Sequence, residues 1–312
     1  MKKIATVTFN PAVDITTQAV RVLPEKKVRC ASPRREPGGG GINVSRAIQR
    51  LGGTSTSIYL AGGPTSKILE QALDAEGLTR LGVPTRQWTR ENLHVFEQST
   101  GQEYRFNMPG GGVTEEEWKL CLEKLASIDP SPDYIVSSGS LPPGVPTDVY
   151  VQLARQAAKL GARLVVDTSG DALRKVLLES AYLIKPNLRE FQDLVGRELA
   201  DEVEQEKAAR ELLEESHCEV IVLSLGTAGA WLITKDISEH IRSPSVPIRS
   251  RVGAGDSMVG GIVLALARGL DLHRAVRFGV ASGAAAVMTD GTELCNREDA
   301  ERIFHQMESA AE

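Results

Sequence analysis

Aromatic side chains are scarce in this sequence, at 4% of 312 residues, and basic residues do not dominate it. Lysine and arginine total 36 against 41 aspartates and glutamates, which gives a net charge of −5. Nucleic acids select strongly basic faces, and single strands also select aromatic stacking platforms. We therefore expect no nucleic-acid partner.

Cysteine is rare as well. Cys30, Cys121, Cys218 and Cys295 are far apart in the chain and form no C-x-x-C pair. This spacing indicates neither a zinc site nor a disulfide framework. Reduced thiols are typical of cytoplasmic proteins, and the sequence therefore predicts a cytoplasmic location.

The sequence has no long hydrophobic run. The apolar segment near the start, within MKKIATVTFNPAVD, soon meets Asn10, Pro11 and Asp14. It is too short for the core of a signal peptide or for a membrane span, and no later stretch is long enough to span a bilayer. We expect no membrane association.

Two common phosphate-binding motifs are also missing. G-x-x-x-x-G-K-[ST] occurs nowhere, which excludes a Walker P-loop. Two glycine-rich turns are present, but Val44 and Met258 stand where G-x-G-x-x-G requires its last glycine. A Rossmann dinucleotide site is therefore disfavoured.

Buried strands alternate with amphipathic helices over most of the chain, which predicts an α/β fold with a doubly wound, mostly parallel, Rossmann-like sheet. Such a sheet carries its ligands at the carboxyl ends of its strands. The expected strands are 4–9, 56–61, 133–138, 163–167, 181–184 and 219–224, with short antiparallel strands in 229–249. The expected helices lie within 36–53 and at 65–81, 114–126, 146–160, 171–179, 201–216, 271–288 and 296–309. Candidate ligand-binding residues at the strand ends are Ser140, Asp167, Lys185, Asn187, Ser224 and Gly226, with Asp14 on the loop after the first strand.

Two further segments predict a small second sheet. Residues 15–35 alternate in polarity and carry several lysines and arginines, and residues 92–107 read as a hairpin. The basic face is either a solvated surface or a lid that holds a phosphate. We expect one domain over residues 1–312, with a lid formed by about 14–36 and 90–108. Because so small a sheet cannot bury both faces alone, we also expect a homodimer formed through it.

The stretch VGAGDSMVGG (252–261) reads as a turn that opens into a helix ending near Gly269. The first N–H groups of a helix lack internal partners and suit an anion. Asp256 lies at that position, and a carboxylate there has two readings. It is either the helix N-cap or a base that takes a proton from a hydroxyl attacking a phosphate.

The segments PGGGGINVSRA (37–47) and VGAGDSMVGG resemble the two signatures of the ribokinase-like PfkB family of carbohydrate kinases. Five further landmarks occur in the family's order: NPAVD (10–14), SGSLPPG (138–144), VDTSG (166–170), KPNLRE (185–190) and SLGTAGA (224–230). The resemblance implies a Rossmann-like core, a β-sheet lid that often forms a dimer clasp, and transfer of the ATP γ-phosphoryl group to a sugar hydroxyl.

Within the family, PEKKVRC (24–30), WTRENLHVFE (88–97), YRFNMPGG (104–111) and the turn GGGG are similar to the minor-isozyme type of 6-phosphofructokinase. This implies phosphorylation of fructose 6-phosphate at its C1 hydroxyl, to fructose 1,6-bisphosphate, in glycolysis. A 1-phosphofructokinase or a tagatose-6-phosphate kinase is the alternative. A non-catalytic sugar-phosphate sensor would be expected to lack the base or the magnesium motif, and both are present.

The resemblance also implies roles on the acceptor side of the site. Asp256 is expected to be the base, with the N–H groups of Gly253, Ala254 and Gly255 holding the charge on the transferring group. The expected sugar-binding residues are Asp14, Gly39, Asn43 and Ser140, and the 6-phosphate is expected to meet Lys27, Arg29 and Arg90.

On the donor side the resemblance implies MgATP. Lys185 is expected at the nucleotide phosphates, Asn187 and Glu190 at Mg²⁺, Ser224, Gly226 and Gly229 in the ATP loop, and Val280 and Ala284 at the adenine. Potassium is expected at Ser250, Val252, Ala286 and Gly291. Three residues depart from the family pattern: Arg251 replaces a common threonine, Ile248 a small polar residue, and Glu293 a residue that is often basic.

Overall fold

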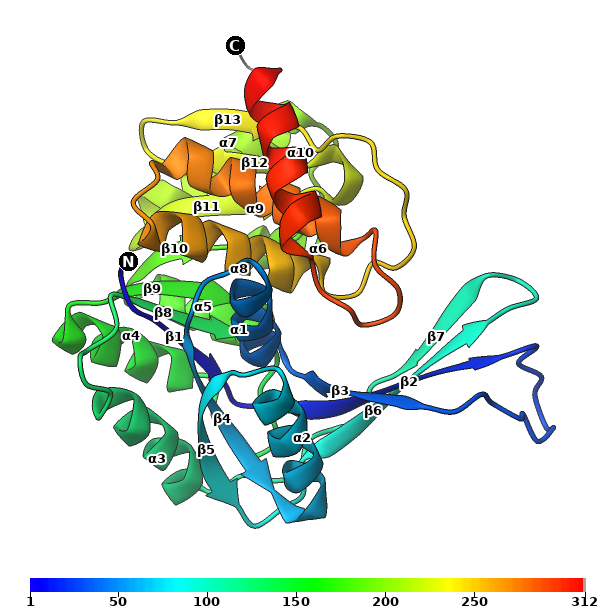
Figure 1. The fold of residues 1–312 in the computed structure, drawn as a ribbon. Coiled ribbons are helices and arrows are strands. Elements are labelled where there is room, and N and C mark those ends of the chain that lie inside the picture. The colour runs from blue at the N-terminus through cyan, green and yellow to red at the C-terminus, as the bar shows by residue number, and fades with distance from the viewer. Residues whose placement is uncertain (311–312) are drawn as a thin grey trace.

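A computed structural model describes residues 1–310 and shows a central nine-stranded sheet covered by helices on both faces (Figure 1). Its strand order is β13-β12-β11-β10-β9-β8-β1-β4-β5. All pairs from β11 to β5 are parallel, whereas β12 and β13 add two antiparallel strands at one edge. The strands are β1 (Ile4–Thr8), β4 (Thr56–Gly62), β5 (Thr79–Thr85), β8 (Tyr134–Ser138), β9 (Arg163–Asp167), β10 (Ala181–Ile184), β11 (Cys218–Ser224), β12 (Ala230–Ile233) and β13 (Ser238–Ile241). The predicted α/β class is confirmed.

The central strands are apolar because both of their faces are covered. Every residue of β1, β8 and β10 is buried, which is the pattern of parallel strands between two helical layers. One layer consists of α1 (Gly40–Arg50), α8 (Ala254–Ala267), α9 (Leu272–Ala286) and α10 (Arg297–Ser309). The other consists of α3 (Glu115–Ala126), α4 (Val149–Leu160), α5 (Gly170–Leu177), α6 (Leu188–Val195) and α7 (Glu202–Glu215).

A second, four-stranded sheet has the order β3-β2-β6-β7, and we refer to it as the small sheet. Its strands are β2 (Ala12–Ala19), β3 (Arg34–Gly38), β6 (Arg90–Glu97) and β7 (Gln102–Phe106). Figure 1 shows it projecting from the body of the molecule, with the loop between β2 and β3 at its outer end. Two distant segments of sequence build this sheet, as predicted.

Two local predictions were wrong, and two elements were not predicted. The helix predicted over 65–81 is α2 (Gly63–Ala75), which is followed by Gly77 in a left-handed conformation (φ 72°) and then by β5. β5 and α6 are not among the elements expected from the sequence. Asp14 was expected on a loop, but it lies within β2, paired with β3 and β6.

Within residues 1–310, no helix is both long enough and apolar enough to cross a bilayer.

Candidate active site

The first turn of α8 forms the floor of the site. Gly253 is its N-cap and adopts a left-handed conformation (φ 74°). A Cβ atom at Gly253 would lie 2.5 Å from Cδ2 of Leu294, so both the backbone angle and the space require glycine. Asp256 is inside the first turn, and the reading of Asp256 as the N-cap is therefore wrong.

Asp256 is held between two elements of the core. Its Oδ2 accepts a hydrogen bond of 3.0 Å from Nδ2 of Asn43, on α1. Its Oδ1 accepts a longer bond of 3.4 Å from Oγ of Ser138, at the end of β8. Both carboxylate oxygens are thus oriented by residues that lie more than a hundred positions from Asp256 in the sequence.

The environment of Asp256 raises its pKa to about 7, mainly because the protein shields the carboxyl from water and secondly because Asp167 carries a like charge. The hydrogen bonds from Asn43 and Ser138 and the charge of Lys185 act in the opposite direction. A carboxyl with a pKa near 7 is well suited to accept a proton at neutral pH.

Lys185 lies under the same turn of α8. It is 5% exposed, and its Nζ is 3.1 Å from Oδ1 of Asp167. A Cβ atom at Gly255 would be 3.6 Å from this Nζ, so the ammonium lies against the helix start. Burial alone would lower the pKa of Lys185, but the charges of Asp167, Glu190 and Asp256 raise it overall. The lysine therefore stays positively charged beside the first N–H groups of α8.

A cavity of about 580 Å³ opens on the other side of this turn. Its wall combines the loop after β11, the segment that precedes α8 and one face of α9. It brings together Ser224, Gly226, Val280 and Ala284, all expected to bind the nucleotide, and also Ile248 and Arg251. Gly229 ends the short 3₁₀ helix η1 (Gly226–Ala228) of the same loop, and a Cβ atom there would lie 2.1 Å from the Ile241 carbonyl oxygen.

The N-x-x-E motif forms the start of α6. Asn187 Oδ1 accepts from the Glu190 N–H and Glu190 Oε2 accepts from the Asn187 N–H, each at 2.9 Å. This reciprocal arrangement is a capping box. It uses one carboxylate oxygen of Glu190 and leaves Oε1 outside the box. Residues 1–310 contain no cluster of three or more histidine, cysteine or acidic side chains able to hold a metal.

Most of the expected sugar-binding residues gather at the start of α1. Gly38, Gly39 and Gly40 allow close packing, because Cβ atoms at positions 38 and 40 would lie 2.3 Å from Asp14 Oδ2 and 2.4 Å from Ser138 Oγ. Gly39 also needs a positive φ of 107°. Asn43 is in the first turn of this helix.

Asn10 joins the remaining members of this group, and the sequence analysis did not single it out. Its Nδ2 donates to Ser140 Oγ at 3.0 Å, and its carbonyl oxygen accepts from Nη2 of Arg90 at 3.1 Å. Asp14 accepts from Asn92 at 2.8 Å. The position of Asn10 directly before Pro11, at the end of a buried strand, was the signal that could have identified it.

Lys27 and Arg29 lie elsewhere. In the β2–β6 register, Ala12 pairs with Arg90 and Ala19 with Glu97, and the loop that carries both cations follows Ala19. Seven residues at about 3.3 Å each separate the two ends of β2 by roughly 23 Å. One chain therefore does not bring Lys27 and Arg29 to Arg90.

Of the four positions expected to bind potassium, Ser250 and Val252 directly precede α8, whereas Ala286 ends α9 and Gly291 follows it. Ser250 is buried, and its Oγ accepts from the Val252 N–H at 3.2 Å. The Ala286 carbonyl accepts two bonds from Thr289, from its N–H at 3.2 Å and its hydroxyl at 2.8 Å. Gly291 faces Thr16 of the small sheet.

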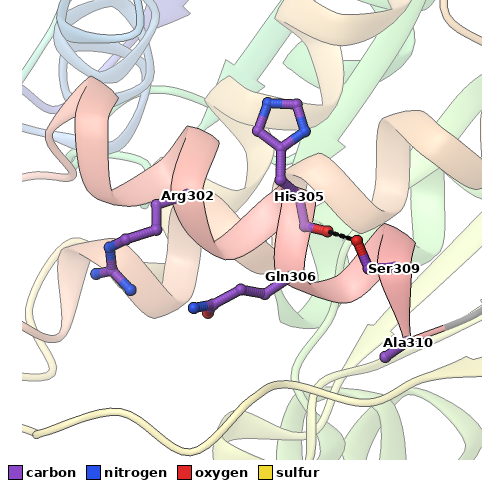
Figure 2. A pocket seen from close by; sticks show the side chains of 5 residues that line it. All are labelled: Arg302, His305, Gln306, Ser309 and Ala310. Carbon is purple, nitrogen blue, oxygen red and sulfur yellow. Dashed lines mark hydrogen bonds between the residues drawn. The ribbon is translucent and has the colours of Figure 1, made fainter.

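A second hollow, of about 700 Å³, lies on the surface of α10 (Figure 2). All of its lining residues come from that one helix and its C-cap residue, Ala310: Arg302, His305, Gln306, Ser309 and Ala310. In Figure 2, Arg302 and His305 point in different directions, and the dashed line joins Ser309 Oγ to the His305 carbonyl of the helix itself. This is a helix surface rather than a convergent site.

Comparison with known proteins identifies the family. Residues 7–299 match the pattern of the pfkB family carbohydrate kinases. The chain is 44% identical over 302 residues to the ATP-dependent 6-phosphofructokinase isozyme 2 of Mycobacterium tuberculosis (strain H37Rv), covering 97% of this chain and 89% of that protein. It is 43% identical over 305 residues to the enzyme of the same name from Escherichia coli K12, covering 97% and 98%.

Solved structures agree. Phosphofructokinase-2 from Escherichia coli in complex with potassium superposes with a TM-score of 0.94 at 41% identity, covering 99% of this chain and all of that one. Ribokinase from Arabidopsis thaliana, at 16% identity, covers 97% of this chain and 98% of its own with a TM-score of 0.78, and it supports the ribokinase-like fold alone. The protein belongs to the pfkB family of carbohydrate kinases.

Proposed function

We propose that the protein is an ATP-dependent 6-phosphofructokinase that phosphorylates the C1 hydroxyl of fructose 6-phosphate. The observation that carries this proposal is the position of Asp256. On one side, its carboxyl contacts Asn43 and Ser138, next to the polar residues gathered at the start of α1. On the other side, the first turn of α8, to which Asp256 belongs, lines the cavity. A base in that place can act on a hydroxyl bound on one side and a phosphoryl group held on the other.

In the proposed reaction Asp256 takes the proton of the C1 hydroxyl. The sugar oxygen attacks the γ-phosphorus of ATP, a new O–P bond forms, and the bond to the β–γ bridging oxygen breaks as ADP leaves. The first N–H groups of α8, at Gly253, Ala254 and Gly255, would stabilise the negative charge of the transferring group. Lys185 adds a buried positive charge beside them.

The donor side fits a nucleotide carried with magnesium. Oxygen donors suit this hard cation, and it keeps several waters, so few protein ligands are needed. Glu190, through its remaining carboxylate oxygen, and Asn187 would hold it by way of water. Bound magnesium supplies neutralisation of phosphate charge. We extend the proposal to potassium at Ser250, Val252, Ala286 and Gly291. The Ala286 carbonyl oxygen would have to coordinate the ion beside the hydrogen bonds that it accepts from Thr289.

On the acceptor side Arg90 faces Asp14 and Asn10, and it is the cation of the proposed 6-phosphate site that lies close to the sugar residues. We propose that the small sheet acts as a lid and pairs with the lid of a second copy. Partly or fully exposed apolar side chains that share one face of it, Leu93 and its cross-strand partner Phe106, would then be covered. Lys27 and Arg29, at the outer end of one lid, would reach the 6-phosphate in the partner's site.

A panel assay with purified protein tests the substrate. ADP release is measured with MgATP and, in separate reactions, fructose 6-phosphate, fructose 1-phosphate, tagatose 6-phosphate and ribose, and fructose 1,6-bisphosphate is quantified as product. We expect the highest kcat/KM with fructose 6-phosphate. Turnover of fructose 1-phosphate or tagatose 6-phosphate without turnover of fructose 6-phosphate would overturn the assignment in favour of the corresponding kinase. We further propose that this reaction takes place in the cytoplasm.

A further inference from the structure

One side chain distinguishes the cavity beside α8 from a neutral pocket. Of the residues that line it, within the described range 1–310, Arg251 is the single charged one. The remaining lining residues are apolar, are small, or carry a hydroxyl: Ser224, Leu225, Gly226, Thr227, Ser243, Pro244, Ser245, Val246, Ile248, Ala254, Gly255, Met258, Val280, Gly283, Ala284 and Val287. The charge of the cavity wall is therefore set by this arginine.

Arg251 has no partner inside the protein. Across residues 1–310 its guanidinium makes no ion pair and no side-chain hydrogen bond, and the residue is exposed. Arg249, two positions earlier, is paired instead, since its Nη1 lies 3.2 Å from Oδ2 of Asp290. Of these two arginines in the same short segment, only Arg249 is neutralised by a carboxylate, and only Arg251 lines the cavity.

Groups that attract anions lie near Arg251. The cavity includes Ala254 and Gly255 of the first turn of α8, where free N–H groups and the helix dipole attract anions. Lys185 lies against Gly255 from the other side. An unpaired cation at such a place gains a charged partner when an anion binds between these groups.

We propose that Arg251 is an additional phosphate-binding residue of this site and pairs with the polyphosphate of the nucleotide. The inference rests on the proposed function, since it assumes that the cavity takes ATP. A guanidinium presents several donors in a planar fork that matches phosphate oxygens, and it carries a fixed charge. Threonine, the replacement tested below, can supply only one neutral hydroxyl. The chain therefore binds nucleoside di- and triphosphates more tightly than a threonine variant of itself.

The test measures nucleotide binding without sugar, by calorimetry, in a sodium buffer of fixed ionic strength with magnesium. The variants are Arg251→Thr, Arg251→Lys and, as a matched control, Arg249→Thr. We expect Arg251→Thr to weaken MgADP binding roughly tenfold, which corresponds to about 1.4 kcal/mol. Adenosine should bind all four proteins within about twofold, because the contact is to phosphate. The MgADP affinity of Arg251→Lys should lie between those of wild type and Arg251→Thr. The MgADP affinity of Arg249→Thr should match that of wild type.

Two results would overturn the inference. One is the same MgADP dissociation constant for wild type and Arg251→Thr. The other is an equal loss for adenosine and ADP, which would make Arg251 a residue that shapes the pocket and does not bind phosphate. Because no sugar is present, failure of fructose 6-phosphate to turn over would leave this test intact. The wild-type protein should also lose ADP affinity more steeply with added sodium chloride than Arg251→Thr does.

Discussion

Asn43 and Asp256 are 213 residues apart in sequence, and their side chains are joined by a hydrogen bond of 3.0 Å that links α1 to α8. The orientation of the amide is fixed by Arg46, whose Nη1 donates to Asn43 Oδ1 at 3.4 Å. Arg46 can only donate, so the amide oxygen must face it and the NH₂ group must face the carboxylate. The wholly buried Arg46 is in turn held by Glu76 at 2.7 Å. The helix that follows the first glycine-rich turn, α1, thereby orients Asp256, which follows the second.

This bond leads to a prediction for Asn43→Ala. The amide stabilises the ionised form of Asp256, so its removal should raise the pKa of Asp256 above its value of about 7. A base works only when deprotonated, and the acid limb of the kcat/KM profile should therefore move to higher pH by about one unit. Activity at pH 7 should fall and partly recover at pH 9. A lower but unshifted profile would show that Asn43 acts on the sugar alone. Gln49→Ala, on the same helix, is the control.

For Asp256→Asn we expect turnover to fall by roughly a thousandfold or more, because the amide cannot accept the proton. The side chain keeps its shape, so binding of fructose 6-phosphate and ADP should stay within a few-fold of wild type. Direct titration of both ligands accompanies the rate measurement. Near-normal turnover would remove Asp256 from the proposed role, and a protein that binds neither ligand would point to misfolding.

The same variant should change stability with a defined pH dependence. The pKa of Asp256 is raised from 3.8 to about 7, so between these values the folded state holds a proton that the unfolded state has lost. Stability therefore falls as the pH rises through this window, and the loss is complete above about pH 7. Asp256→Asn should melt several degrees higher than wild type at pH 8, and the difference should shrink towards pH 4. Equal differences in melting temperature at pH 8 and pH 4 would contradict this.

The core could be predicted from sequence because its signals are local. Buried strands such as β1 and β8 are continuous apolar runs, and the glycine-rich turns announce the starts of α1 and α8. β5 was not predicted because it lies at the edge of the sheet and buries only Val83 of its seven residues, so its sequence lacks an apolar run. α6 was not predicted because its eight residues bury a single side chain, Phe191.

The arrangement of the site depended on pairings that no local pattern contains. Asp14 was misplaced because β2 continues directly into the small sheet, where its partners come from residues 34–38 and 90–97. The same register decides that Lys27 lies far from Arg90. A sequence motif can indicate three cations for one phosphate, but the strand pairing determines whether one chain can assemble them.

A homodimer formed through the small sheet predicts that Phe106→Asp weakens association. Phe106 is 46% exposed on β7, and a charge there should be tolerated by the single chain but not by a covered interface. Sedimentation should show a dimer for wild type and a shift towards monomer for the variant. Leu178→Asp is the control, because Leu178 is 74% exposed on the main body of the protein. A monomeric wild-type protein at assay concentrations would refute the proposed dimer.

If the outer loop of each lid completes the partner's site, two variants that are each nearly inactive at a low fructose 6-phosphate concentration should complement each other. One variant is Asp256→Asn, and the other is the double substitution Lys27→Ala, Arg29→Ala, which should show a raised KM for fructose 6-phosphate with little change for ATP. In a mixed dimer, the site that keeps Asp256 receives the intact loop of the Asp256→Asn chain. Random exchange gives half mixed dimers with one complete site each, so about a quarter of the wild-type activity should return. Each variant alone is the control. Activity that never exceeds the sum of the two separate variants, although mixed dimers are detected, would show that Lys27 and Arg29 do not act across the interface.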